Sequence, residues 1–201
     1  MWSEIVVYLR LGVTHIANFT AIDHMVFLLA MTVAYTWKDW KRVLWLVTAF
    51  TVGHSLTLLL ATLELVHVND RLVEILIAVT IALAALVNIF RRTDTLTFPP
   101  AKGAERDWLK YVLVFFFGLI HGLGFSNFLR SLLGAEESLL APLLSFNIGL
   151  EIGQILIVAV LLSLGTLIVR FLGSRTRDWV LVGSGMALGI ALEMIVLRLV
   201  G

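Results

Sequence analysis

The stretch LLAPLLSFNIGLEIGQILIVAVLLSLGTLIVRFL, residues 139–172, decides the fold class of this chain. Before Arg170 it carries one charged residue, Glu151, and it is longer than the roughly 20 apolar residues that cross a bilayer as a helix. Because lipid offers the backbone no hydrogen-bond partner, such a stretch must be helical. The sequence therefore predicts a transmembrane helix that tilts, bends near Gly149 and Gly153, or extends beyond the bilayer.

The rest of the chain has the same apolar character. Of its 201 residues, 60% are hydrophobic and 14% are charged, whereas about a quarter are charged in soluble domains. We predict an all-α polytopic membrane protein that forms a single transmembrane domain, a bundle of about seven helices. The predicted helices cover residues 2–18, 21–37, 40–65, 71–90, 108–129, 139–172 and 179–199, with a linker at 91–107. The absence of cysteine excludes disulfides and thiolate metal sites, and a net charge of +1 gives no indication of nucleic-acid binding.

Lysine and arginine are concentrated in alternate connections between the predicted helices. The basic loops are 38–42, 91–110 and 170–178, and the remaining connections carry few basic residues. The positive-inside rule predicts that these three loops are cytoplasmic in a bacterial inner membrane. The junction between the first two helices would then face outward, and the N-terminus would lie inside if the first helix spans the bilayer.

Four of the five histidines fall in or at the ends of apolar helices, together with acidic residues. A charged residue at the centre of a transmembrane helix costs about 2.5–3.5 kcal/mol, so such residues normally face the bundle interior and have a function. Imidazole with carboxylate, and without thiol, suits a divalent nickel, cobalt or zinc ion. We predict a metal site made of His15, Asp23, His24, His54, His121 and Glu151.

Further polar residues lie beside these candidates. Asn147 and Gln154 share a helix face with Glu151, and Thr51 and Ser55 lie next to His54. We predict that these four orient the ligands or line a pathway, although hydrogen bonding between helices or within one helix would also explain them. Asp23 has three possible roles: as a ligand, as a group that orients a neighbouring histidine, or as part of a capping box with Thr20.

Four segments together carry a family resemblance: HIANFTAIDHMVFLLA at 15–30, LVTAFTVGHSLTLLLATL at 46–63, FFFGLIHGLGFSNFLRSLLG at 115–134 and LLSFNIGLEIGQI at 143–155. The pattern resembles the HupE/UreJ family and, more distantly, nickel/cobalt permeases with a His-spacer-Asp-His motif. The resemblance implies a bacterial membrane protein that carries nickel or a related metal for metalloenzyme maturation. Here the spacer between His15 and Asp23 has seven residues, longer than in the permease motif, and it lacks the usual glycine.

Three functions fit these features. The first is transport of a divalent transition metal through the His/Asp/Glu site, and the second is an intramembrane zinc-dependent hydrolase with Glu151 as base. The third is a metal-binding or assembly partner that does not transport. Because signatures of soluble catalytic sites are absent, the sequence favours a transporter over an enzyme. Its partners would be the metal ion and the lipid bilayer. The glycines at 183, 185 and 189 would serve either packing within the bundle or a contact between the copies of a homo-oligomer.

Overall fold

The computed structural model describes residues 2–18, 22–66, 68–90, 107–133, 140–171, 173 and 175–200. These residues form seven α-helices and one short 3-10 helix, which confirms the predicted all-α bundle. The elements are α1 (Trp2–Ile16), α2 (Asp23–Thr32), η1 (Trp37–Asp39), α3 (Trp40–Thr62), α4 (Asp70–Phe90), α5 (Asp107–Leu133), α6 (Leu140–Phe171) and α7 (Thr176–Val200).

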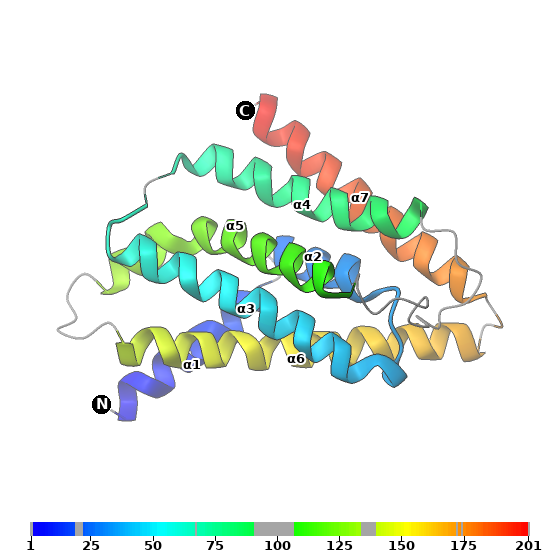
Figure 1. Cartoon of the computed structure of the whole chain (residues 1–201), viewed down its shortest axis with the longest axis horizontal. Helices are drawn as coiled ribbons and strands as arrows, with labels where there is room; N and C mark the ends of the chain where they lie inside the picture. The colour runs from blue at the N-terminus through cyan, green and yellow to red at the C-terminus, as the bar shows by residue number, and fades with distance from the viewer. Residues whose placement is uncertain are drawn as a thin grey trace.

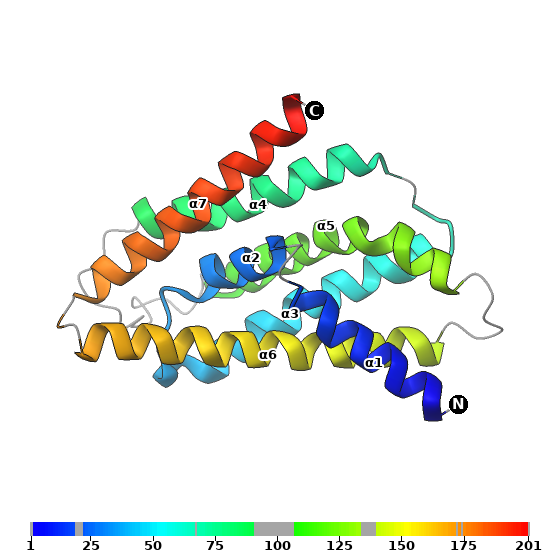
Figure 2. The same ribbon diagram turned by 180° about the vertical axis from the view of Figure 1, so that it is seen from behind.

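The six longer helices pack as three pairs around the short helix α2. Helix α3 lies along α5, α1 crosses α6, and α4 lies along α7 (Figures 1 and 2). Helix α2 contacts α4, α6 and α7, so it is enclosed by the long helices. The first turn of α2 therefore lies inside the bundle, where side chains from several helices can meet.

Helices α1 and α2 together make one interrupted crossing of the bundle. In Figure 1, α1 begins at the end of the bundle where α3 ends, and α2 continues from the centre toward the end where α3 begins. At 1.5 Å per residue, the two helices measure about 22 Å and 15 Å, each shorter than the roughly 30 Å hydrocarbon core. The junction was predicted at the outer surface; its residues 19–21 lie outside the described residues, whereas Ile16 and His24, in the helix ends on either side, are buried in the bundle.

Helix α2 is shorter than the predicted helix 21–37, and local hydrogen bonds are found at its first residue and in the segment that follows it. At its start, the Asp23 carboxylate accepts a hydrogen bond from the backbone amide of His24 at 2.9 Å. At its far end, Asp39 Oδ2 accepts hydrogen bonds from the backbone amide and the hydroxyl of Thr36, a capping box that starts η1 and α3. The predicted partner of Asp23, Thr20, lies outside the described residues.

Glycines bring the histidine-bearing helices into backbone contact. A Cβ added at Gly53 would meet the carbonyl oxygen of Phe115, and one at Gly118 would meet that of Phe50, so α3 and α5 are in van der Waals contact. A Cβ added at Gly149 would meet the carbonyl oxygen of Leu9, so α1 and α6 are also in van der Waals contact. Helix α6 continues without interruption from Leu140 to Phe171, so Gly149 serves this close approach.

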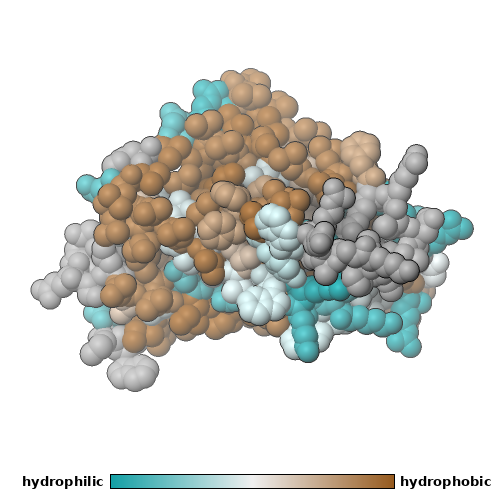
Figure 3. Space-filling view, viewed as in Figure 1, coloured by the Kyte–Doolittle hydropathy of each residue, from teal (hydrophilic) through white to brown (hydrophobic). Residues whose placement is uncertain are grey.

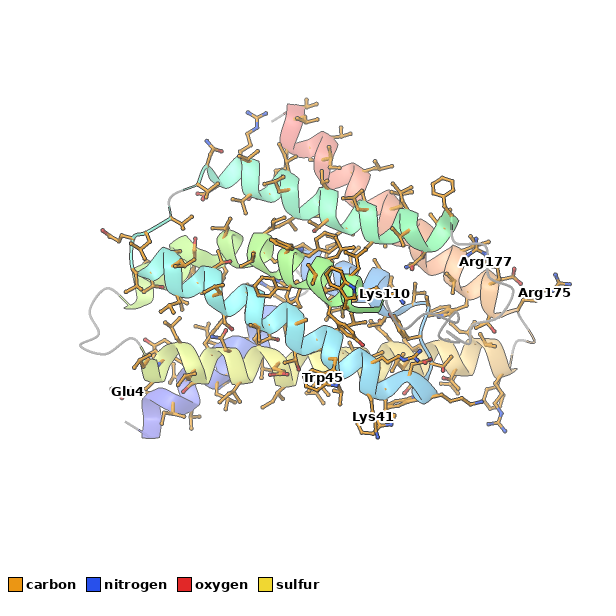
Figure 4. The ribbon with its side chains drawn as sticks, viewed as in Figure 1. Glu4, Lys41, Trp45, Lys110, Arg175 and Arg177 are labelled. Atoms are coloured by element: carbon orange, nitrogen blue, oxygen red, sulfur yellow. The ribbon has the colours of Figure 1, made fainter. Side chains whose placement is uncertain are left out.

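The surface is that of a membrane protein. The five segments Trp37–Thr62, Asp70–Phe90, Trp108–Ser126, Leu140–Phe171 and Thr176–Val200 are long and apolar enough to cross a bilayer. Figure 3 shows a broad apolar surface along the helices, with hydrophilic residues gathered toward the ends. Figure 4 places Lys41, Arg175 and Arg177 at the end where α3 begins, which we call the basic end, and Glu4 at the opposite end, which we call the distal end.

Candidate functional site

Four histidines from four helices meet at the interruption between α1 and α2. His15 lies in the last turn of α1 and His24 in the first turn of α2, while α3 supplies His54 and α5 supplies His121. The ring centre of His24 lies 4.7 Å from that of His15, 6.0 Å from that of His54 and 5.2 Å from that of His121. These four side chains form a continuous group, which we call the histidine cluster.

Three of the four histidines, His24, His54 and His121, are buried, and most ring nitrogens of the cluster lack hydrogen-bond partners among the described residues. His54 and His121 are 0% exposed. In the described structure, five buried nitrogens of the cluster have no hydrogen-bond partner: Nε2 of His15, Nε2 of His24, both nitrogens of His54, and Nδ1 of His121. A buried polar atom left without a partner costs about 1–3 kcal/mol, so this arrangement is expensive for a purely structural core. Ring nitrogens without hydrogen-bond partners are expected in a ligand-binding site when no ligand is bound.

Asp23 orients one member of the cluster. Its Oδ1 lies 3.1 Å from Nδ1 of His24 and also accepts the His24 backbone amide. An ionised carboxylate can only accept hydrogen bonds, so His24 carries its proton at Nδ1 and leaves Nε2 with a free lone pair. Of the three roles predicted for Asp23, this geometry favours the orientation of His24, which is the usual carboxylate–histidine arrangement at metal sites.

Aromatic rings surround the cluster. The ring centre of His15 lies 3.8 Å from that of Phe125, and His54 packs near-parallel to Phe50 and Phe146 with ring centres 6.0 Å and 6.5 Å away. Such an apolar shell limits the access of water and strengthens electrostatic interactions between a bound cation and its ligands.

A cavity of about 1000 Å³ connects the cluster with the distal end of the bundle. His15, Asp23, His24 and His121 line it, together with residues from α4, α5 and α7. At its far side, Glu74 near the start of α4 forms an ion pair with Arg198 near the end of α7. The far side of the cavity therefore carries a carboxylate and a guanidinium that offset each other's charge.

The remaining predicted residues lie on a neighbouring contact between α3 and α6. Thr48 Oγ1 donates a hydrogen bond to Glu151 Oε1 at 2.7 Å, and Thr51 Oγ1 donates to Gln154 Oε1 at 2.7 Å. Neither Glu151 nor His54 is among the described residues that line the cavity.

Three other polar groups near this contact have local roles or no partner. The hydroxyl of Ser55 donates to the Thr51 carbonyl within α3, as expected for a serine in a helix. In the described structure, Oδ1 of Asn147 and Nε2 of Gln154 have no hydrogen-bond partner. Asn147 and Gln154 therefore each keep one buried polar atom without a hydrogen-bond partner among the described residues.

Sequence reasoning missed one residue at the cluster. Thr80 of α4 is buried, and its Oγ1 lies 3.1 Å from Nε2 of His121. The available signal was a single hydroxyl in an otherwise apolar run, IAVTIALAALV at 77–87. Threonine in such a run commonly bonds to its own helix, so its sequence does not identify it as a site residue.

The spacing of the histidines suits a shared divalent ion. A metal about 2.0–2.1 Å from a ring nitrogen lies roughly 3.2 Å from the ring centre, so two such rings at a tetrahedral angle have centres roughly 5 Å apart. The observed separations of 4.7–6.0 Å bracket that value. Within the described ranges, no group of three or more His, Asp or Glu side chains is placed so that it could hold a metal ion, so the structure brings the histidines together without forming a complete metal site.

Comparison with known proteins gives one match over almost the whole chain. A family model described as HupE / UreJ protein matches residues 1–198. No curated protein matches the chain, and no solved structure matches it.

Proposed function

Because the chain belongs to the HupE/UreJ family, we propose that it carries a divalent transition-metal ion across the membrane by way of the histidine cluster. The observation that carries this proposal is the group of buried histidine nitrogens that have no hydrogen-bond partner in the described part of the chain, beside a cavity. Nickel, cobalt and zinc all accept imidazole ligands, so the cargo is assigned to this class of ions.

The interrupted helix supports transport because it places two ligands at mid-bundle. Binding sites in many transporters are formed where a helix is broken, with the two half-helices ending at the substrate. Here His15 ends one half-helix, and Asp23 with His24 begins the other. The ion would enter from the cavity at the distal end, and the ionised Asp23 would offset part of its charge.

The route beyond the cluster follows the contact between α3 and α6. Thr48 precedes His54 by six residues on α3, which is about 9 Å nearer the basic end. Glu151, bonded to Thr48, would receive the ion or a compensating proton after the histidines release it. By the positive-inside rule, the basic end is cytoplasmic in a bacterial inner membrane, so this route leads inward.

Transport is tested with the purified protein in liposomes that enclose a metal-sensitive dye. We expect uptake of at least one of Ni²⁺, Co²⁺ and Zn²⁺ into protein-containing liposomes, and loss of that uptake in His24→Ala. Glu151→Gln should lower the rate of uptake more than it lowers binding, because Glu151 lies outside the histidine cluster. Metal binding without uptake would contradict transport and favour a non-transporting partner, whereas release of lipid fragments would favour a hydrolase.

Asp23→Asn should weaken metal binding by about 10-fold to 100-fold, as expected when the group that orients a histidine ligand is lost. The asparagine keeps the size of the side chain but lacks the charge that favours the Nδ1–H form of His24. Titration of the purified protein with Zn²⁺ in a calorimeter measures the effect. Asp39→Asn is the matched control, because Asp39 caps η1 through Thr36 and should leave the affinity unchanged. Equal affinities of Asp23→Asn and the unmodified protein would contradict the orienting role.

A further inference from the structure

A buried threonine contacts the histidine cluster from a helix that supplies none of the predicted ligands. Thr80 lies at the middle of α4 and is 3% exposed. Its Oγ1 lies 3.1 Å from Nε2 of His121 on α5, and 2.7 Å from the carbonyl oxygen of Ile77 in its own helix. One oxygen atom therefore has two polar neighbours, and the nature of these neighbours determines which group supplies each proton.

The first proton is that of the hydroxyl. The Thr80 and Ile77 oxygens are 2.7 Å apart, a distance at which a hydrogen must lie between them, and only the threonine can supply it. Because a hydroxyl has one proton, Thr80 has none left for His121. The contact with His121 is therefore made by Nε2–H, which donates to the lone pair of the Thr80 oxygen.

The second nitrogen of His121 agrees with this assignment. A neutral imidazole that carries its proton at Nε2 has its lone pair at Nδ1. Nδ1 of His121 is buried and has no hydrogen-bond partner in the described part of the chain. His121 also lines the cavity, and its ring centre lies 5.2 Å from that of His24. The unprotonated nitrogen thus belongs to a side chain of the site itself.

We propose that Thr80 is a positioning residue that holds His121 in its Nε2–H form, so that Nδ1 binds the metal ion. Asp23 selects the other neutral form in His24: it holds the proton at Nδ1, so that Nε2 is left to bind the metal. The two histidines would then present different nitrogens to one ion, each fixed by a partner that does not touch the ion. The proposal rests on the proposed function for the identity of the ligand, but the proton position is a property of the metal-free protein.

The test compares two substitutions that differ in one respect. Thr80→Val keeps the branched shape and removes the acceptor oxygen, whereas Thr80→Ser keeps the hydroxyl. In metal-free protein labelled with ¹⁵N-histidine, NMR distinguishes the two neutral forms of His121, whose signals are identified by their loss in His121→Gln. We expect the Nε2–H form in the unmodified protein and in Thr80→Ser, and a mixture of both forms in Thr80→Val.

Zn²⁺ binding gives the second readout. We expect Thr80→Val to lose about 10-fold or more in affinity, the usual effect of removing a partner of a metal-bound histidine, while Thr80→Ser stays within about threefold. Thr32→Val is the control: Thr32 is buried at 1% exposure and donates only to the Leu28 carbonyl, so its loss should change neither readout.

Two results would overturn the proposal. One is an unchanged proton position on His121 in Thr80→Val, and the other is an equal loss of affinity in Thr80→Val and Thr80→Ser, which would indicate a packing role. If the unmodified protein shows the Nε2–H form and binds Zn²⁺ but takes up no metal into liposomes, transport is contradicted while the role of Thr80 stands.

Discussion

His54→Leu is expected to abolish metal uptake and to lower metal affinity by at least about 100-fold. This loss lies at the upper end of the range for residues that support a metal site, because the substitution removes a metal ligand itself. His54 is the only member of the histidine cluster with both ring nitrogens buried and unpartnered in the described structure. Its ring centre lies 6.0 Å from those of both His15 and His24, so it completes the group from the α3 side. Leucine fills a similar volume without a lone pair.

The same substitution should leave the metal-free protein at least as stable as before. Removing two unpartnered buried nitrogens relieves a cost of about 1–3 kcal/mol for each group, and leucine adds apolar contacts with Phe50 and Phe146. Function and stability should therefore change in opposite directions, as at sites where a protein gives up stability for binding.

Both quantities can be measured on protein purified in detergent, by Zn²⁺ titration and by thermal unfolding without metal. Leu58→Ala is the reciprocal control, since Leu58 lies one turn from His54 on α3 and is fully buried. It should lower the free energy of unfolding by about 2–5 kcal/mol while keeping the metal affinity. A His54→Leu protein that unfolds more easily and still binds Zn²⁺ would show that His54 is a structural residue.

The second large effect is expected at the contact between α3 and α5. Gly118→Ala should lower the free energy of unfolding by about 3 kcal/mol, at the upper end for overpacking, because the added methyl group meets the Phe50 carbonyl of α3. Backbone atoms cannot turn aside as a side chain can, so the two helices must separate. Since these helices carry His54 and His121, the separation should also weaken Zn²⁺ binding.

Gly185→Ala is the matched control on α7. A methyl group there meets nothing within 4 Å, and alanine is favoured over glycine in a helix by about 1 kcal/mol. The same chemical change should therefore be destabilising at Gly118 and neutral or stabilising at Gly185, as measured by thermal unfolding and by the fraction of monodisperse protein. Equal effects at the two positions would contradict the close contact between α3 and α5.

Several features could be predicted from the sequence because they depend on composition and on short-range patterns. Apolar runs predict helices in a bilayer whatever their neighbours, and within the run 139–172 the residues Leu140–Phe171 form one continuous helix, α6. His54 and His121 were identified because an imidazole in such a run is costly unless it has a use. The same reasoning could not identify Thr80, whose hydroxyl can satisfy itself within its own helix.

Other features depend on which helices lie next to one another. Loop charges indicate where helices end, but they do not show that the last turn of α1 and the first turn of α2 bring His15 and His24 together, with ring centres 4.7 Å apart. Glu151 was predicted together with the histidines as a metal-site residue, and the structure shows that it accepts a hydrogen bond from Thr48 on α3. The sequence by itself determined that this is a helical membrane protein with histidines inside it, because the cost of transferring each residue into lipid is local. Only the tertiary structure decided which nitrogens meet, because that depends on where glycines let helices touch.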